Sequence, residues 1–229
     1  LAFHNIPSAF SVRLTANAAV AAERLYNDTK RGTEDSKYKS LEDAKEAREK
    51  RRLGENERYM KRYGVNLSNP DNYDLIIDTS YSTIDDISDT ILTCLDCYQE
   101  EEPFVKNWTS PKTLLPNQNE RETTGRQLYT FEEVFESIKT KDYIPSASIQ
   151  TVEVDGYKYI VDGHHRNFAA AYLGKTLVPY INIAKDDECI PGTNFTARQL
   201  AKGTTYKMLT GHEWLINEKF SYKHIYPDI

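Results

Sequence analysis

Asp162, Gly163, His164, His165 and Arg166 form one uninterrupted run, and these residue types together can bind a phosphate group. Histidine is scarce, with five in 229 residues, so an adjacent pair stands out. The apolar stretch before the run and the alanines after it predict a strand that turns into a helix. The first N–H groups of that helix, Arg166 and an inward-facing imidazole would form an anion site.

The same run offers a metal ligand, because Asp162 could hold a divalent ion or fix the tautomer of a histidine. A zinc site built from His164 and His165 alone is not expected, since adjacent residues point in different directions on a helix. A plain alternative stays open, in which Asp-Gly is only a turn and Arg166 is only a surface residue. Local chemistry does not decide between the two.

A second set of charged residues lies earlier in the chain, in a stretch of high helix propensity. Arg51, Glu55 and Arg58 have the spacing i, i+4 and i+7, so a helix places them on one face. Two guanidinium groups beside a carboxylate can clamp an anion, while the carboxylate orients one arginine or accepts a sugar hydroxyl. Charge pattern alone favours a solvated helix face, because such faces are common.

The elements that would position these residues form two modules, the first α/β and the second α+β. We expect residues 1–98 to form the first module, 99–111 an acidic linker broken by prolines, and 112–229 the second module. The first should contain strands at 9–16 and 73–80, a helix capped by Asn17, a helix at 40–63 capped by Ser40, and a helix at 83–98. The second should contain helices at 128–139, 165–174 and 196–209, a hairpin turning at Asp155-Gly156, and a strand at 177–183.

The composition is that of a soluble globular protein, with 39% hydrophobic and 28% charged residues. No apolar stretch approaches the roughly 18 residues of a membrane span, so we expect no membrane association. Three sparse cysteines suit a reducing compartment and predict a cytoplasmic protein. The net charge of −6 disfavours DNA as a partner for the whole surface, although a local basic patch is compatible with it.

Residues 9–98, with the Arg51–Arg58 run and the strand YDLIIDTS at 73–80, resemble the C-terminal half of cytidylate kinases and their relatives. The resemblance implies that Arg51 and Arg58 bind the acceptor nucleotide, that Glu55 stands where the family usually carries Asp, and that Arg24 lies in the lid region. Such kinases also need a Gly-rich phosphate loop, and these 229 residues contain none. We therefore expect a further segment, a second copy of the chain or a partner to cover the incomplete sheet.

Residues 106–183 resemble the ParB/sulfiredoxin-like superfamily, and the Asp162–Arg166 run is similar to the variant found in free serine kinases. The resemblance implies that this run lines a phosphate site for ATP or ADP, with CTP as an alternative, and that Asp162 helps to hold Mg²⁺. Gln118 stands where those kinases carry the glutamate that acts as the catalytic base. Glu120 is therefore the candidate base, with Glu122 as an alternative, and Asp162 and His165 complete the candidate catalytic set.

Together these features predict a nucleotide-binding protein that transfers a phosphoryl group to a small hydroxyl-bearing substrate. The reaction needs mostly positioning and charge neutralisation, which a helix start, cationic side chains and a metal ion supply. Two alternatives stay open. The chain could be a non-catalytic nucleotide-sensing or interaction module, or the C-terminal part of a larger nucleotide kinase-like protein.

Overall fold

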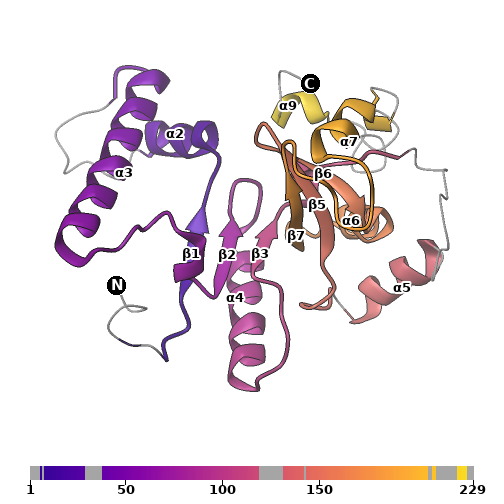
Figure 1. Cartoon of the computed structure of the whole chain (residues 1–229). Helices are drawn as coiled ribbons and strands as arrows, with labels where there is room; N and C mark the ends of the chain where they lie inside the picture. The colour runs from indigo at the N-terminus through magenta and orange to yellow at the C-terminus, as the bar shows by residue number, and fades with distance from the viewer. Residues whose placement is uncertain are drawn as a thin grey trace. The chain divides into compact units, whose positions relative to one another are not determined.

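The computed structural model describes residues 6, 8–28, 38–118, 131–141, 143–205, 208–209 and 221–225. It shows a mixed α/β structure (Figure 1) whose contacts divide into two compact units, unit 1 (Leu1–Ser80) and unit 2 (Tyr81–Ile229). Within the described parts of the chain, no helix combines the length and the apolar character that a membrane crossing requires.

Unit 1 is built on two short parallel strands, β1 (Val12–Thr15) and β2 (Leu75–Asp78). Between them the chain forms helices α2 (Ala18–Asn27) and α3 (Leu41–Tyr63) and the 3-10 turn η1 (Pro70–Asn72). Helix α2 packs on α3, and each contributes one fully buried small residue, Ala22 and Ala44. The two parallel strands place their carboxyl ends at one edge, beside the start of α2.

Both helices of unit 1 begin at the caps that the sequence predicts. The Asn17 side chain accepts a hydrogen bond from the Ala19 N–H at 2.9 Å, and Ser40 Oγ accepts one from the Asp43 N–H at 3.1 Å. Helix α3 ends at Gly64, whose positive φ of 67° a glycine adopts without strain. The predicted long helix at 40–63 is thereby confirmed.

Unit 2 contains a sheet in the order β3-β7-β5-β6-β4, with both parallel and antiparallel neighbours. Its strands are β3 (Asn107–Thr109), β4 (Leu114–Leu115), β5 (Ile149–Val154), β6 (Tyr157–Asp162) and β7 (Val178–Lys185). Its helices are α4 (Ile84–Gln99), η2 (Pro111–Thr113), α5 (Phe131–Lys141), α6 (His164–Tyr172), α7 (Ala197–Gly203) and α9 (Tyr222–Ile225).

The two faces of this sheet carry separate cores. Helices α5 and α6 cover one face, where Ile138 of α5 and Ala169 and Ala170 of α6 meet strand residues such as Ile149 and Ile160. Helix α7 covers the other face through Ala197, which joins a cluster of strand residues, namely Val152, Val154 and Ala184. The small side chains of Ala169 and Ala170 let α6 pack closely on the sheet.

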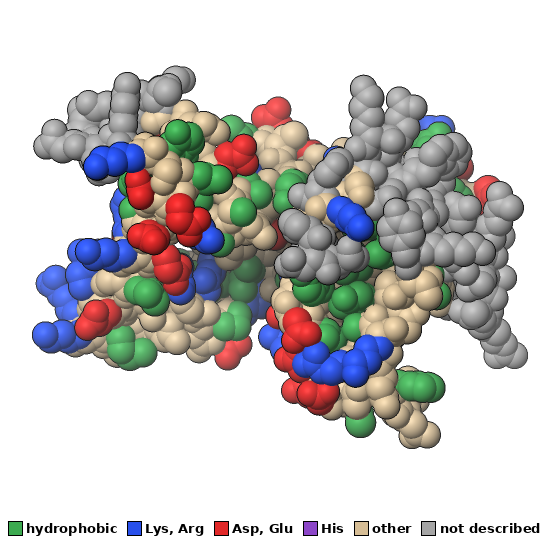
Figure 2. All heavy atoms as spheres, turned by 90° about the horizontal axis from the view of Figure 1, so that it is seen from above, with side chains coloured by type: hydrophobic (Ala, Val, Ile, Leu, Met, Phe, Trp, Pro, Cys, Tyr) green, Lys and Arg blue, Asp and Glu red, His purple; other side chains and the backbone are tan. Residues whose placement is uncertain are grey.

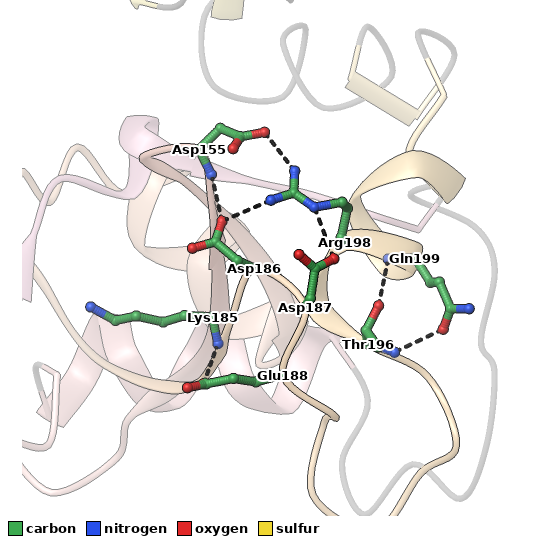
Figure 3. A network of polar contacts seen from close by, with 8 residues as sticks. All are labelled: Asp155, Lys185, Asp186, Asp187, Glu188, Thr196, Arg198 and Gln199. Atoms are coloured by element: carbon green, nitrogen blue, oxygen red, sulfur yellow. Dashed lines mark hydrogen bonds and ion pairs between the residues drawn. The ribbon is translucent and has the colours of Figure 1, made fainter.

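The hairpin β5–β6 turns at Asp155 and Gly156, with φ values of 52° and 84°, as the Asp-Gly pair predicts. Arg198 at the start of α7 holds this turn in place (Figure 3). Its guanidinium donates to Asp155 at 2.8 Å, to Asp186 at 3.2 Å and to Asp187 at 3.1 Å. One cation therefore fastens the hairpin turn and the end of β7 to α7.

The boundary between the compact units lies at Ser80/Tyr81, earlier than the predicted boundary at residue 98. Helix α4 groups with unit 2 because Thr176 Oγ1 donates to Asp86 in its first turn, and Ser82 Oγ donates to the Thr176 carbonyl at 3.1 Å. The segment 99–111, predicted as a linker, contains β3, and its Trp108 is buried. Proline and acidic residues alone did not reveal that short strand.

Candidate functional site

Unit 1 contains a pocket of about 280 Å³ between α2 and α3. Its lining residues are Ala21, Arg24, Leu25, Asp28, Tyr38, Ala47, Arg48 and Arg51. Three guanidinium groups thus face one carboxylate, which gives the pocket a positive balance. The carboxyl ends of parallel strands are where open α/β sheets commonly bind ligands, and Arg24 ties the pocket to the end of β2.

Helical spacing explains why these residues meet. On α2 the pocket residues Ala21, Arg24 and Leu25 follow the pattern i, i+3 and i+4, which forms one face of a helix, and Asp28 is the C-cap that follows. On α3 the pocket residues Ala47 and Arg48 lie one turn after the buried Ala44, and Arg51 lies two turns after it. The small alanines let the two helices approach, and the arginines extend from the edge of that contact.

Arg24 is held by the residues that follow β2. One of its terminal nitrogens donates to Thr79 Oγ1 at 3.2 Å, and the other donates to the carbonyls of Thr79 and Ser80 at 2.7 and 3.1 Å. The guanidinium therefore has a fixed position at the pocket wall, and it brings positive charge there without being free to move.

Arg51 and Glu55 form the ion pair that their spacing predicts, with Nε and Oε1 3.1 Å apart. Both side chains are substantially exposed, at 65% and 40%, so the pair is open to solvent and to an incoming anion. Arg58 does not line the pocket, and its Nε donates to the Gly54 carbonyl at 3.3 Å. The three residues share a face, but only Arg51 reaches the pocket.

Arg48 is the pocket residue that the sequence reasoning missed. It is half-buried, and it makes no hydrogen bond or ion pair with any residue that the structure describes. Its donors are therefore available to a ligand. The signal was present in the spacing of Ala44, Ala47 and Arg51, which marks the face of α3 that packs on α2, with Arg48 at its border.

The run Asp162–Arg166 lies at the junction of β6 and α6, so the predicted strand, turn and helix are confirmed. Gly163 is the N-cap of α6 with φ 97°, and no side chain caps this helix start among the described residues. A Cβ atom at Gly163 would lie 3.2 Å from Nη2 of Arg166. Glycine is thus required here both by the backbone and by its close neighbour.

Arg166 is engaged inside unit 2. Its Nη2 donates to Asp162 Oδ2 at 2.7 Å, its Nη1 donates to the Ser148 carbonyl, and its side chain is 28% exposed. Asp162 itself is 65% exposed on the other side of this pair. Within the described residues, no group of three or more His, Cys, Asp or Glu side chains is arranged to hold a metal ion.

The two histidines lie in different environments, as the helix geometry predicts. His164 is 8% exposed, and its Nε2 accepts a long hydrogen bond of 3.4 Å from the Asn117 N–H. Burial lowers the pKa of His164 to about 4, so this imidazole is neutral near pH 7. The His165 ring packs edge-on against Phe131, with the ring centroids 5.8 Å apart. The pair therefore does not converge on one ligand.

Two amide oxygens near this helix are buried without a hydrogen-bond partner among the described residues. They are Oδ1 of Asn117 and Oδ1 of Asn167, while Asn167 Nδ2 donates to the Pro111 carbonyl at 3.2 Å. Buried unpaired acceptors are uncommon and call for an explanation such as a bound donor. The candidate base Glu120 lies outside the described residues, so the structure does not test its position.

Residues 1–81 match the family model of the cytidylate kinase-like family, a range that coincides with unit 1 and its arginine pocket. No curated protein matches the chain. The resemblance to the cytidylate kinase type over the first part of the chain is thus supported, whereas the ParB/sulfiredoxin-like assignment of the second part has no such support and stays a prediction.

Proposed function

We propose that the chain is a nucleotide-binding protein of phosphotransferase type and that unit 1 binds phosphate groups in its arginine pocket. The observation that carries this proposal is the half-buried Arg48, whose donors have no partner among the described residues, beside Arg24 and Arg51. Arginine forms strong, often bidentate, hydrogen bonds to phosphate. The match of residues 1–81 to a cytidylate kinase-like family agrees with a nucleotide as the ligand.

The pocket also suits the remainder of a nucleotide. Its volume of about 280 Å³ approaches that of small-ligand sites, and its wall includes the Tyr38 ring and the apolar Leu25. An aromatic ring could pack on a base, and Asp28 could accept a hydrogen bond from a sugar hydroxyl. Phosphates of a nucleotide usually carry Mg²⁺, which would enter with the ligand rather than through a cage of protein carboxylates.

A second candidate site lies at the start of α6, where no side chain caps the helix among the described residues and the Asn167 Oδ1 is buried and unpaired. In this proposal the α6 N–H groups and His165 bind the phosphates of ATP, ADP or CTP, and Asp162 helps to hold Mg²⁺. Glu120 would take the proton of a small substrate hydroxyl as its oxygen attacks the terminal phosphorus of the nucleotide, and the nucleotide shortened by one phosphate leaves. Arg166 would contribute only if it left Asp162.

The experiment is a thermal-shift titration with ATP, ADP, CTP and CMP in the presence of Mg²⁺, on wild type, Arg48→Gln and His165→Ala. A ligand at about 100 times its Kd stabilises the folded protein by about 2.7 kcal/mol, which is a readable shift. The pocket proposal expects a shift that Arg48→Gln reduces by about half, as a tenfold loss of affinity would, and that His165→Ala keeps. The reverse pattern would assign the nucleotide to α6, and no shift with any nucleotide would overturn both sites.

Turnover is measured separately, because binding without catalysis is the alternative that the sequence leaves open. Release of ADP from ATP is followed with nucleoside monophosphates and with small hydroxyl compounds as acceptors. Binding together with ADP release that depends on the acceptor supports a phosphotransferase. Binding without ADP release supports a nucleotide-sensing module or a part of a larger kinase-like protein.

A further inference from the structure

Helix α3 separates its charges in a way that nucleotide binding alone does not require. Four of its arginines, Arg48, Arg51, Arg58 and Arg62, are spaced i, i+3, i+10 and i+14. At 3.6 residues per turn they fall within an arc of roughly 80°. We call these four residues the arginine stripe. Glu55 is the acidic residue of α3 that shares this arc.

The other acidic residues of α3 lie away from the stripe. Five of the six, Glu42, Asp43, Glu46, Glu49 and Glu57, fall on the opposite side of the helix by the same spacing. The lysines Lys50 and Lys61 also lie on that opposite side. A solvated helix usually intersperses its charges, whereas α3 places its arginines on one side and most of its acids on the other.

Most of the arginine stripe lies at the surface. Arg51, Arg58 and Arg62 are exposed, and Figure 2 shows basic side chains gathered at the left edge of the molecule, where α3 lies. Arg58 uses one bond to its own helix, to Gly54, and the Arg62 guanidinium lies 5.3 Å from the Tyr63 ring centroid. Among the described residues, these contacts leave most N–H donors of Arg58 and Arg62 unused.

The length of the stripe indicates a ligand with several phosphates in a row. From Arg48 to Arg62 the helix rises about 21 Å at 1.5 Å per residue. That distance corresponds to about six phosphates of one stacked nucleic-acid strand at roughly 3.4 Å each. A mononucleotide in the pocket would reach only the Arg48 end.

Aromatic side chains border the stripe. Tyr59 and Tyr63 follow one another by four residues along its edge, with ring centroids 5.9 Å apart. Tyr63 is 39% exposed. Proteins that bind single strands without sequence preference combine a cationic track for the backbone with aromatic rings for the bases. We infer that unit 1 binds single-stranded nucleic acid along α3, with the backbone on the arginine stripe and bases against these two rings.

The acidic net charge of the chain does not oppose this inference. The value of −6 describes the whole chain, whereas the stripe carries four positive charges and one negative charge. Screening limits the reach of distant acidic residues to about 10 Å at 0.1 M salt. The proposed site for single-stranded nucleic acid shares Arg48 and Arg51 with the proposed nucleotide pocket. Arg58 and Arg62 lie beyond the pocket, so variants at these two residues test the nucleic-acid site separately.

The test is fluorescence anisotropy with a labelled DNA single strand of about 12 nucleotides, a length within the range of known single-strand sites. The probe variant is Arg58→Gln/Arg62→Gln. The matched control is Lys50→Gln/Lys61→Gln, which removes the same charge from the other side of the same helix. Glutamine keeps the helix propensity, and circular dichroism checks that α3 is intact.

The expected result is a loss of about tenfold in affinity for the arginine variant and little change for the lysine control. The slope of log K against log salt should also fall by about 1.4, since each phosphate contact contributes about 0.7 for a single strand. Nucleotide binding in the thermal-shift titration should stay as in wild type, so failure of the pocket and failure of the stripe give different results.

Three outcomes would overturn the inference. The first is no binding of the single strand by wild type at low salt. The second is an equal loss for the arginine variant and the lysine control, which would mean unspecific attraction by the helix. The third is that an acidic peptide or inorganic polyphosphate binds with the same dependence on Arg58 and Arg62 while the single strand does not.

Discussion

The pocket of unit 1 and the start of α6 in unit 2 both combine arginine with polar neighbours, yet they use their arginines differently. In the pocket, Arg48 has no partner among the described residues. At the start of α6, Arg166 is bound to Asp162 and to the Ser148 carbonyl, and His164 is buried and neutral. The pocket has unused N–H donors, whereas the donors of Arg166 bind Asp162 and the segment before β5.

This difference shows that the types of residue in a motif do not suffice to define an anion site. What matters is whether their donors remain unused once the chain has folded. The run Asp162–Arg166 has the residue types of a phosphate site, and its Arg166 acts in this structure as a brace between β6 and the segment before β5. The charge pattern around the pocket arginines favoured a solvated helix face, although Arg48 is better placed than Arg166 to bind a ligand.

The largest expected effect tests the buried His164 at the start of α6 through pH. Since the pKa of His164 falls from 6.5 to about 4 on folding, the unfolded chain takes up a proton in a range where the folded protein does not. Stability from this group is complete above pH 6.5 and is lost as pH falls towards 4, by up to about 3 kcal/mol. Urea unfolding at pH 7, 5.5 and 4.5 measures the loss.

The comparison for this prediction is between His164→Gln and His165→Gln, because carboxylates also titrate at low pH. The His164 variant should lose part of the pH dependence between 6.5 and 4. The His165 variant should keep it, since that ring is half-buried beside Phe131 rather than enclosed. If both variants unfold with the wild-type pH dependence, His164 is not enclosed in a neutral form.

The second prediction tests the Arg166 contact with Gly163. In Gly163→Ala the new methyl group must displace the Arg166 guanidinium, and the φ of 97° adds strain, so we expect a loss of about 2 kcal/mol. Gly174→Ala is the matched control, because its φ is 75° and nothing lies within 4 Å of its Cβ position. Equal losses in chemical denaturation would mean that Arg166 gives way without cost.

How much of this could be predicted from sequence depended on whether the signal was local. The caps at Asn17 and Ser40, the Asp155-Gly156 turn and the Gly163 helix start involve residues a few positions apart, and all were predicted. The length of α3 followed from its helix propensity and from Gly64 after it. Such features need no knowledge of the rest of the fold.

The parts that were missed depend on contacts between distant segments. Arg48 becomes a pocket residue only because α2 packs on α3. Arg166 is engaged because the Ser148 carbonyl, 18 residues away, comes within reach. Strand β3 has three residues and forms by pairing with β7, so it is too short for a hydrophobic periodicity to predict it. Sequence periodicity reports which side of a helix is buried, but not which donors are left unused.

The third prediction tests the pocket directly. Arg48→Gln should weaken binding of the stabilising nucleotide about tenfold, or about 1.4 kcal/mol, because it removes charge-assisted bonds to phosphate. Arg52→Gln is the control, since Arg52 on the same helix is bound to Glu49 at 2.7 and 2.9 Å and does not line the pocket. Isothermal titration calorimetry measures both. An equal loss of nucleotide affinity in Arg52→Gln would mean that the positive charge of α3 as a whole, and not Arg48 in particular, attracts the nucleotide.

The smallest expected effect concerns a third arginine, Arg198, which is fully engaged like Arg166 but donates to three carboxylates rather than to one carboxylate and a backbone carbonyl. Arg198 binds Asp155, Asp186 and Asp187, whose side chains are 55–78% exposed (Figure 3). Exposed ion pairs contribute little, so Arg198→Gln should lower Tm by less than Gly163→Ala does. The difference should shrink further at 1 M salt, where the screening length falls to about 3 Å. A larger drop that salt does not reduce would show that Arg198 acts through packing of α7 rather than through charge, and would place it with Arg166 among the structural arginines.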